Sequence, residues 1–172
     1  MKWISILVLL LSVAVLGCTP SQQPAPEQEN AEEVTFDEAM DSPKQTAGEW
    51  LENYDQALKA AKELKRPVLI NFTGSDWCSW CIKLHKEVFD KEAFKTYAKE
   101  NLVLLKLDFP RSLPQTPEVK AANEKKAKEY GVTGFPTIVL ISSDGKEINR
   151  TGYQPGGAEA YVKHLQDLLS VK

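Results

Sequence analysis

The sequence predicts an α/β fold, because segments with helical and strand-like patterns alternate along residues 48–172. The apolar runs at residues 68–72 and 101–108 have the length and composition of buried strands. Helical patterns precede, separate and follow these runs. A third apolar run, at residues 137–141, is followed by a turn sequence near the end of the chain. We therefore expect one core built from alternating helices and strands.

The first helix is predicted after Trp50, where large side chains recur at spacings of three and four. These side chains are Leu51, Tyr54, Leu58, Ala61 and Leu64. The pattern stops before Pro67, and the strand at residues 68–72 follows directly. Residues 73–76 then form the loop that leads from this strand to the cysteine motif.

The segment after the cysteines is predicted to be a helix whose inner face carries Leu84, Val88 and Phe89. Its pattern breaks near Asp90 and then resumes. The residues that continue it are Phe94, Tyr97 and Ala98. The strand at residues 101–108 follows this helical segment.

The last part of the chain predicts a polar helix, a hairpin and a final helix. The polar helix covers residues 118–130. Residues 143–146 form a turn that joins the strand at 137–141 to a strand at 147–152. The final helix covers residues 158–171 and carries one apolar stripe. The stripe consists of Ala160, Tyr161, Leu165, Leu168 and Leu169.

Length and charge limit the classes of function. The chain has 172 residues and 42% hydrophobic residues, enough for one domain of ordinary size with appendages. Its formal net charge is −3 at pH 7, so it lacks the basic surplus that is typical of nucleic-acid binding. We predict no nucleic-acid partner, and we expect a monomer. The excess of acidic over basic residues lies near the N-terminus, where positions 27–41 hold seven acidic residues and no basic one.

The N-terminal segment has the features of an export signal. Lys2 gives a positive start, and residues 3–16 form an apolar stretch too short for a comfortable membrane span. The stretch ends in Val15-Leu16-Gly17-Cys18, which resembles the lipobox of bacterial lipoproteins. The resemblance implies a signal peptide at residues 1–17 and a lipid anchor on Cys18. The alternative is ordinary signal cleavage beside an incidental cysteine, and both predict export from the cytoplasm.

Residues 18–47 are predicted to be a disordered acidic tether, followed by the domain at residues 48–172. The tether contains prolines, glutamines and the acidic run but few large apolar residues. Such a composition cannot bury enough surface to offset the entropy lost on ordering. Thr19 follows Cys18, where an aspartate would mark retention of a lipoprotein in the inner membrane. We therefore expect attachment in the cell envelope on the periplasmic face, with the outer membrane favoured if the cell has one.

Cys78 and Cys81 form the motif that best indicates function, because they lie between a predicted strand and a predicted helix. Unpaired N–H groups and the positive end of the dipole at a helix start favour a thiolate. A lowered thiol pKa makes a cysteine nucleophilic at neutral pH, so we predict a redox pair. Structural zinc needs about four ligands, and the other candidates are only Cys18, His85 and His164. A purely structural disulfide would close too short a loop to add much stability.

The order of these elements resembles the thioredoxin fold over about residues 48–172. The residues Trp77-Cys78-Ser79-Trp80-Cys81 are similar to the active-site motif of the thioredoxin family. Gly134-Phe135-Pro136-Thr137 resembles the segment that holds the family's cis-proline. Residues 74–78, followed by 86–89, resemble a bacterial branch of extracytoplasmic thioredoxin-like proteins. The resemblance implies a central mixed sheet flanked by helices and the activity of a thiol–disulfide oxidoreductase.

The resemblance also implies roles for the site residues. Cys78 is expected to attack a client disulfide, and Cys81 to release the client from the mixed disulfide. The Phe135–Pro136 bond is expected to be cis and to face Cys78, where a client chain can pair as an added strand. Trp77 and Trp80 are candidates for an apolar docking rim. For Trp77, the alternative is that it packs the loop.

The expected partners are protein thiols and disulfides, together with a redox partner that recycles Cys78 and Cys81. No cofactor and no metal are expected. The direction of exchange stays open, because reductases, isomerases and oxidases use the same atoms at different potentials.

One departure from the thioredoxin pattern concerns the proton of Cys81. Thioredoxins bury a carboxylate on the strand below the motif, where it relays the proton of the second cysteine. Asn71 is the nearest equivalent here, and an amide cannot act as a general base. We expect a water, Lys106 or Asp76 to assist instead. Lys106 falls where thioredoxins carry a lysine on the neighbouring strand.

A different class of function is a binding module that holds an envelope client or copper without turnover. His85 lies four residues after Cys81, so Cys78, Cys81 and His85 could form a soft three-ligand site on one helical face. An exposed histidine without a ligand role is the simpler interpretation.

Overall fold

The computed structural model describes residues 48–170. The signal peptide predicted for residues 1–17, the tether at 18–47 and the lipid anchor at Cys18 lie outside the described residues. Residues 171–172 lie outside them as well.

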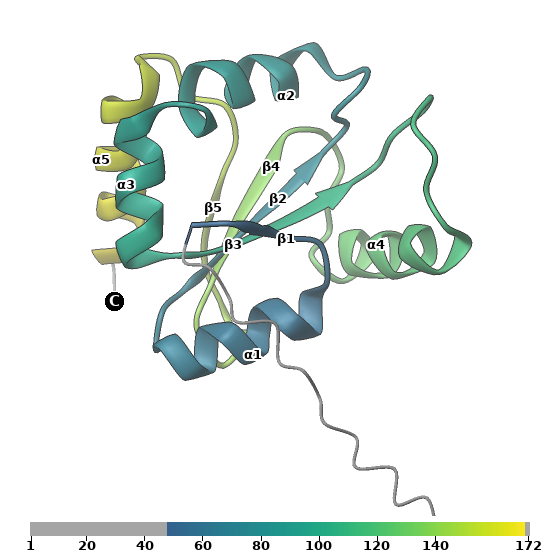
Figure 1. The fold of residues 1–172 in the computed structure, drawn as a ribbon, viewed down its shortest axis with the longest axis horizontal. Helices are drawn as coiled ribbons and strands as arrows, with labels where there is room; N and C mark the ends of the chain where they lie inside the picture. Colours follow the sequence, from purple (N-terminus) through teal and green to yellow (C-terminus); the bar gives the residue numbers. More distant parts are fainter. Residues whose placement is uncertain (1–47, 171–172) are drawn as a thin grey trace, which may run out of the picture. The chain divides into compact units, whose positions relative to one another are not determined.

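The described domain is built on a mixed sheet of five strands in the order β1-β3-β2-β4-β5 (Figure 1). Strands β1, β3 and β2 run parallel, while β4 is antiparallel to both β2 and β5. The mixed sheet expected from the family resemblance is therefore present. The strands are β1 (Trp50–Leu51), β2 (Val68–Thr73), β3 (Val103–Asp108), β4 (Thr137–Ile141) and β5 (Glu147–Thr151).

Helices cover both faces of this sheet. The helices are α1 (Tyr54–Leu64), α2 (Ser79–Leu84), the π-helix η1 (His85–Phe89), α3 (Glu92–Asn101), α4 (Pro117–Glu129) and α5 (Gly157–Ser170). Buried residues of α2, η1, α3 and α5 share one core cluster with the sheet. Residues of α1 and of the end of α4 share the other. Helices α3 and α5 lie side by side in Figure 1.

Side-chain alternation on β2 and β3 explains how the core gives way to a polar site. Leu69 and Leu104 belong to the cluster under α2, α3 and α5. Because side chains alternate between faces along a strand, Asn71 lies on the same face as Leu69, and Lys106 on the same face as Leu104. Asn71 and Lys106 are also register partners. Along these strands, the apolar pair Leu69 and Leu104 is thus followed by the polar pair Asn71 and Lys106 on the side nearer the cysteines.

The start of the domain differs from the sequence prediction. Trp50 and Leu51 pair with β3 and are not part of the first helix. The chain stays extended there because Asn53 caps α1, its Oδ1 accepting the Gln56 N–H at 3.0 Å. Alanines form the buried face of this helix, namely Ala57, Ala60 and Ala61. Leu64 lies at the exposed end of the helix.

The structure corrects one further boundary and one buried position. Asn101 is the last residue of α3, and the following strand begins at Val103. In α5, Ala158 takes the buried position that the sequence assigned to Ala160, which is exposed. The predicted break near Asp90 is confirmed, because η1 ends at Phe89 and α3 begins at Glu92.

Candidate active site

The site centres on a disulfide between Cys78 and Cys81, with 5.2 Å between the two Cα atoms. Cys78 is the N-cap of α2, and its Sγ accepts the backbone N–H of Cys81 at 3.2 Å. The two cysteines are only 7% and 4% exposed. After reduction, the Cys78 sulfur at this helix start is placed to be stabilised as a thiolate by the same N–H group.

The loop before Cys78 is held by β2 and β3. Ser75 donates its N–H and its hydroxyl to the Asp108 carboxylate at 3.0 and 2.5 Å. The Cys78 N–H donates to the Gly74 carbonyl at 2.9 Å. A Cβ atom at Gly74 would come within 2.5 Å of the Trp77 indole, so this close approach requires glycine. Strand ends and loop therefore fix the position of Cys78.

Trp77 packs the loop. Its indole N–H donates to the Phe109 carbonyl at 2.8 Å, and its ring meets the edge of Phe135 at 5.9 Å between centroids. The Arg111 guanidinium lies 3.8 Å from the ring centroid, in cation–π contact. These contacts agree with the alternative interpretation of the sequence, in which Trp77 packs the loop.

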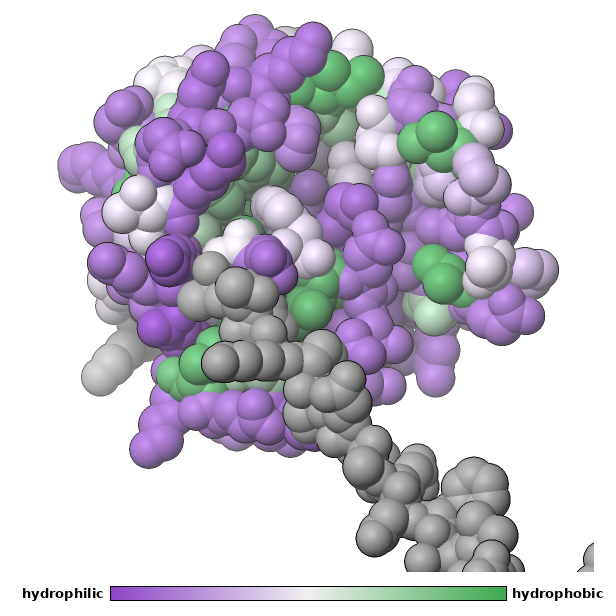
Figure 2. Space-filling view, viewed as in Figure 1, coloured by the Kyte–Doolittle hydropathy of each residue, from purple (hydrophilic) through white to green (hydrophobic). Residues whose placement is uncertain are grey.

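Trp80 lies on the surface beside the disulfide and is 54% exposed. Its ring is 5.2 Å from the ring of Tyr153, and the Lys83 ammonium lies 5.2 Å from the Trp80 centroid. The face of the described domain drawn in Figure 2 is mostly hydrophilic, with hydrophobic residues in separate small groups. Among residues 48–170, Trp80 is the one exposed large hydrophobic residue within the cysteine motif.

Asp76 organises the neighbouring loop. Its carboxylate accepts the backbone N–H groups of Arg111 at 3.0 Å, Ser112 at 2.6 Å and Leu113 at 3.1 Å. The N–H groups of Arg111 and then Ser112 hold the pKa of Asp76 below its usual range. Asp76 is not among the residues that line the cavity beside Cys81, described next. Of the three candidate relay residues, it is the one that the structure places elsewhere.

Asn71 and Lys106 do lie beside the buried cysteine. Together with Cys81 they line a cavity of about 250 Å³, whose wall also includes Thr73 and Ser75. Asn71 is 7% exposed, and its Oδ1 has no hydrogen-bond partner within the described residues. The Lys106 ammonium pairs with the Glu52 carboxylate at 2.7 Å. The cavity therefore offers an amide and a paired cation next to Cys81.

The predicted cis bond between Phe135 and Pro136 is confirmed. Phe135 links this segment to the site, because its ring packs 5.9 Å from Trp77 and 5.0 Å from Phe109. The Thr137 hydroxyl donates to the Gly134 carbonyl at 2.7 Å and closes the turn. That Pro136 faces Cys78 and receives a client chain stays a prediction.

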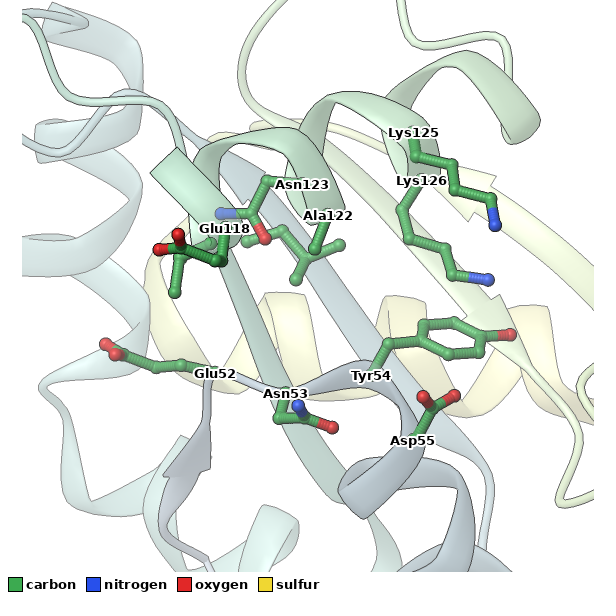
Figure 3. Close-up of a pocket in the computed structure, with 11 residues that line it drawn as sticks. Glu52, Asn53, Tyr54, Asp55, Glu118, Ala122, Asn123, Lys125 and Lys126 are labelled. Carbon is green, nitrogen blue, oxygen red and sulfur yellow. The ribbon is translucent and has the colours of Figure 1, made fainter. Parts of the chain in front are cut away.

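A larger hollow of about 390 Å³ lies elsewhere (Figure 3). It lies between the start of α1, with Tyr54 and the preceding Glu52, and α4, with Asn123 and Lys126. It shares no lining residue with the Cys81 cavity. The smaller cavity is the one that adjoins the redox chemistry.

No metal centre is formed within residues 48–170, where no group of three or more His, Cys, Asp or Glu side chains could hold an ion. The three-ligand copper arrangement considered for Cys78, Cys81 and His85 is not formed in this structure, since the cysteines are joined to each other.

Across the part of the chain that the structure describes, helices are too short or too polar to cross a membrane.

Several contacts at the site were not predicted from the sequence. Asp108 accepts the Ser75 hydroxyl and holds the loop before Cys78, and its position at the end of a predicted strand was the one signal in the sequence for this role. Asp90 pairs with His85, with 3.2 Å between Oδ1 and Nε2. No helical spacing rule indicates that pair, because the residues are five apart.

The mixed sheet, the disulfide at a helix start and the cis bond before Pro136 define a thioredoxin-like redox domain. Residues 54–168 match the family described as thioredoxin-like domain, and the chain belongs to this family. It is 38% identical over 121 residues to the disulfide bond reductase DsbH of Chlamydia pneumoniae, covering 70% of this chain and 73% of that protein. The family and this relative identify the chain as a thiol–disulfide oxidoreductase.

Comparison with solved structures agrees with this family assignment. A solved DsbH oxidoreductase superposes with a TM-score of 0.68 at 37% identity, over 72% of this chain and 85% of that chain. The thiol:disulfide interchange protein DsbD of Vibrio vulnificus is 29% identical over 165 residues, or 90% of this chain. The chain spans only 24% of that longer protein.

Proposed function

We propose that this protein is a disulfide reductase of the cell envelope, which reduces protein disulfides through Cys78 and Cys81. The similarity to a disulfide bond reductase, which extends over most of both chains, is the observation that carries the direction of exchange. In the proposed reaction, Cys78 attacks a client disulfide and Cys81 then releases the reduced client. A redox partner returns electrons to the pair.

The client is proposed to dock on two features beside the disulfide. Trp80 offers exposed apolar surface, supported from behind by Tyr153. The segment at Phe135–Pro136 would pair with an extended client chain as an added strand. Trp77 is proposed to act indirectly, by holding this segment against the cysteine loop.

The protein is further proposed to act as a monomer held to the membrane by a lipid on Cys18, at the periplasmic face of the outer membrane where the cell has one. Residues 18–47 would serve as the tether. The lipobox-like sequence before Cys18 supports this proposal. Replacement of Cys18 by alanine should abolish incorporation of labelled fatty acid and leave the precursor unprocessed. Normal labelling of the variant would refute the anchor.

The activity is tested by reduction of insulin with dithiothreitol as electron donor, comparing the full chain with its Cys78→Ser and Cys81→Ser variants. We expect Cys78→Ser to abolish catalysis, because the attacking sulfur is lost. Cys81→Ser, reduced and then freed of dithiothreitol before mixing, should instead accumulate a mixed disulfide with insulin, which is visible on a non-reducing gel. If the intact protein gives no rate above that of dithiothreitol alone, the proposed function is wrong.

A further inference from the structure

The reaction needs a proton acceptor that the buried amide cannot supply. Cys81 must lose its thiol proton before it can attack Cys78, since the thiolate is the nucleophile. Cys81 is 4% exposed, so bulk water does not reach it easily. Asn71 lies in the same cavity, but an amide does not accept a proton near neutral pH. Another group on the cavity wall must therefore take it.

The ionisable groups on that wall are His85, Lys86, Asp90 and Lys106. The two lysines are cations, which can stabilise a Cys81 thiolate but cannot accept its proton. Lys106 is also paired with the carboxylate of Glu52. On the outer side, His85 shares a second hollow with Lys95 and Lys99 of α3.

His85 has the chemistry and the position of a proton acceptor. Histidine is the side chain that ordinarily exchanges protons near neutral pH. His85 lies four residues after Cys81 in a continuous helical segment, and residues at this spacing share a face. It lines the cavity of Cys81 and is itself exposed. A proton taken inside the cavity can therefore leave to solvent from the same ring.

The π-turn provides the partner of this imidazole. The Asp90 N–H donates to the His85 carbonyl at 2.9 Å, a bond between residues five apart. This turn brings the Asp90 carboxylate to 3.2 Å from His85 Nε2. In the neutral ring Nε2 then carries the hydrogen, and Nδ1 keeps the lone pair that accepts a proton. The carboxylate stabilises the imidazolium that forms, as in other carboxylate–histidine pairs.

We propose that the His85–Asp90 pair accepts the Cys81 proton and thereby sets the rate at which the mixed disulfide is resolved. The Cys81 thiol gives its proton through one water in the cavity to His85 Nδ1. The resulting thiolate attacks Cys78 Sγ, the Cys78–Cys81 bond forms, and the client sulfur leaves with the electron pair of the broken bond. The two electrons come from the two cysteines. Asn71 Oδ1 and Lys106 supply the acceptor and the donor that hold this water.

The proposal rests on the exchange reaction at Cys78 and Cys81 and is independent of the client. The test therefore uses a small aromatic disulfide, 5,5′-dithiobis(2-nitrobenzoic acid), with the reduced full-length protein. Attack by Cys78 releases one coloured thiolate, and attack by Cys81 releases the second. Both phases are followed by stopped-flow absorbance from pH 5.5 to 8.5. The first phase reports an intact site, and the second reports the proposed step.

His85→Gln should slow the second phase at pH 7 by about a hundredfold, the lower end of the range for general-base catalysis. In the intact protein this rate should fall as acid protonates the imidazole, and His85→Gln should lose that step. Asp90→Asn should also slow the second phase, because the ring loses the carboxylate that lies 3.2 Å from Nε2. His164→Gln is the matched control, since His164 bonds Thr151 and lines no cavity with Cys81.

Three results would overturn the proposal. One is a second phase in His85→Gln with the rate and pH profile of the intact protein. Another is an equal loss in His164→Gln. The third is slowing of the first phase to the same extent as the second. A failure to reduce insulin beside normal two-phase reaction with the small disulfide would refute the proposed client class and leave this inference standing.

Discussion

Asn71 and Lys106 are register partners on the parallel strands β2 and β3, and both line the cavity beside Cys81. The pair therefore sets the environment in which the Cys81 thiolate forms. Lys106 is the cation of the pair, and Glu52 at 2.7 Å partly neutralises it. A nearby cation favours the charged form of a thiol and lowers its pKa.

Lys106→Met should therefore remove a cation that stabilises the Cys81 thiolate and slow resolution of the mixed disulfide. Stability should change little, since such partly exposed ion pairs contribute roughly 0–1 kcal/mol. Glu52→Gln is the control, because it breaks the same ion pair and leaves the cation. Stopped-flow resolution and thermal unfolding of both variants separate the two effects. Equal slowing in the two variants would mean that the ion pair, not the cation, matters.

Trp80 is the residue through which client affinity can be tested. Its replacement by alanine removes exposed apolar surface beside the disulfide. A docking contact worth about 1.4 kcal/mol corresponds to about a tenfold loss of affinity. We expect Trp80→Ala to raise the KM for insulin by about this factor while leaving the reaction with the small aromatic disulfide unchanged. Val119→Ala is the matched control, because Val119 is also an exposed apolar residue but lies on α4. An unchanged KM in Trp80→Ala would exclude the indole from docking.

Asn71→Asp tests whether proton acceptance limits resolution. The new carboxylate lies at a position that is 7% exposed, so burial should raise its pKa well above that of a solvated aspartate. A carboxylate of raised pKa can accept the Cys81 proton near neutral pH. Introduced into His85→Gln, this substitution should restore most of the lost rate at pH 7 to 8. No recovery would mean that His85 acts on Cys81 in some other way.

Asn71→Asp should also change the stability of the protein in a pH-dependent way. If the pKa of the introduced carboxyl is higher in the folded state than in the unfolded state, the free energy of unfolding is unaffected at pH values below the unfolded pKa. Stability is then lost as pH rises through the folded pKa. Asn71→Asp should therefore be less stable than the intact protein at pH 8, and the deficit should shrink toward pH 4. Urea unfolding at the two pH values measures it.

Much of the site follows from the predicted strands and the resemblance to thioredoxins, whereas the connections made by loops do not. The strand patterns placed Asn71 and Lys106 on strands, and the resemblance to thioredoxins predicted that both lie near the cysteines. The two-residue strand at Trp50–Leu51 was missed, because a helical spacing continued through it in sequence. The His85–Asp90 pair depends on an i→i+5 turn, for which helical periodicity gives no signal. The role of Asp76 depends on backbone N–H groups more than thirty residues away.

Asp76 yields the last prediction, which concerns acid stability. Its carboxylate accepts three N–H groups from the loop that carries Arg111 and Leu113, and those bonds lower its pKa. A depressed folded-state pKa contributes stability that is fully present above the unfolded pKa of about 4. That contribution is lost as pH falls through the folded value. Below that value, the intact protein and Asp76→Asn should unfold at similar temperatures, whereas at pH 6 the variant should unfold earlier. Asp144→Asn, at the exposed hairpin turn, is the control for removing one surface carboxylate. A temperature gap between the intact protein and Asp76→Asn that stays constant from pH 6 to pH 2.5 would show that these N–H groups do not select the ionised form.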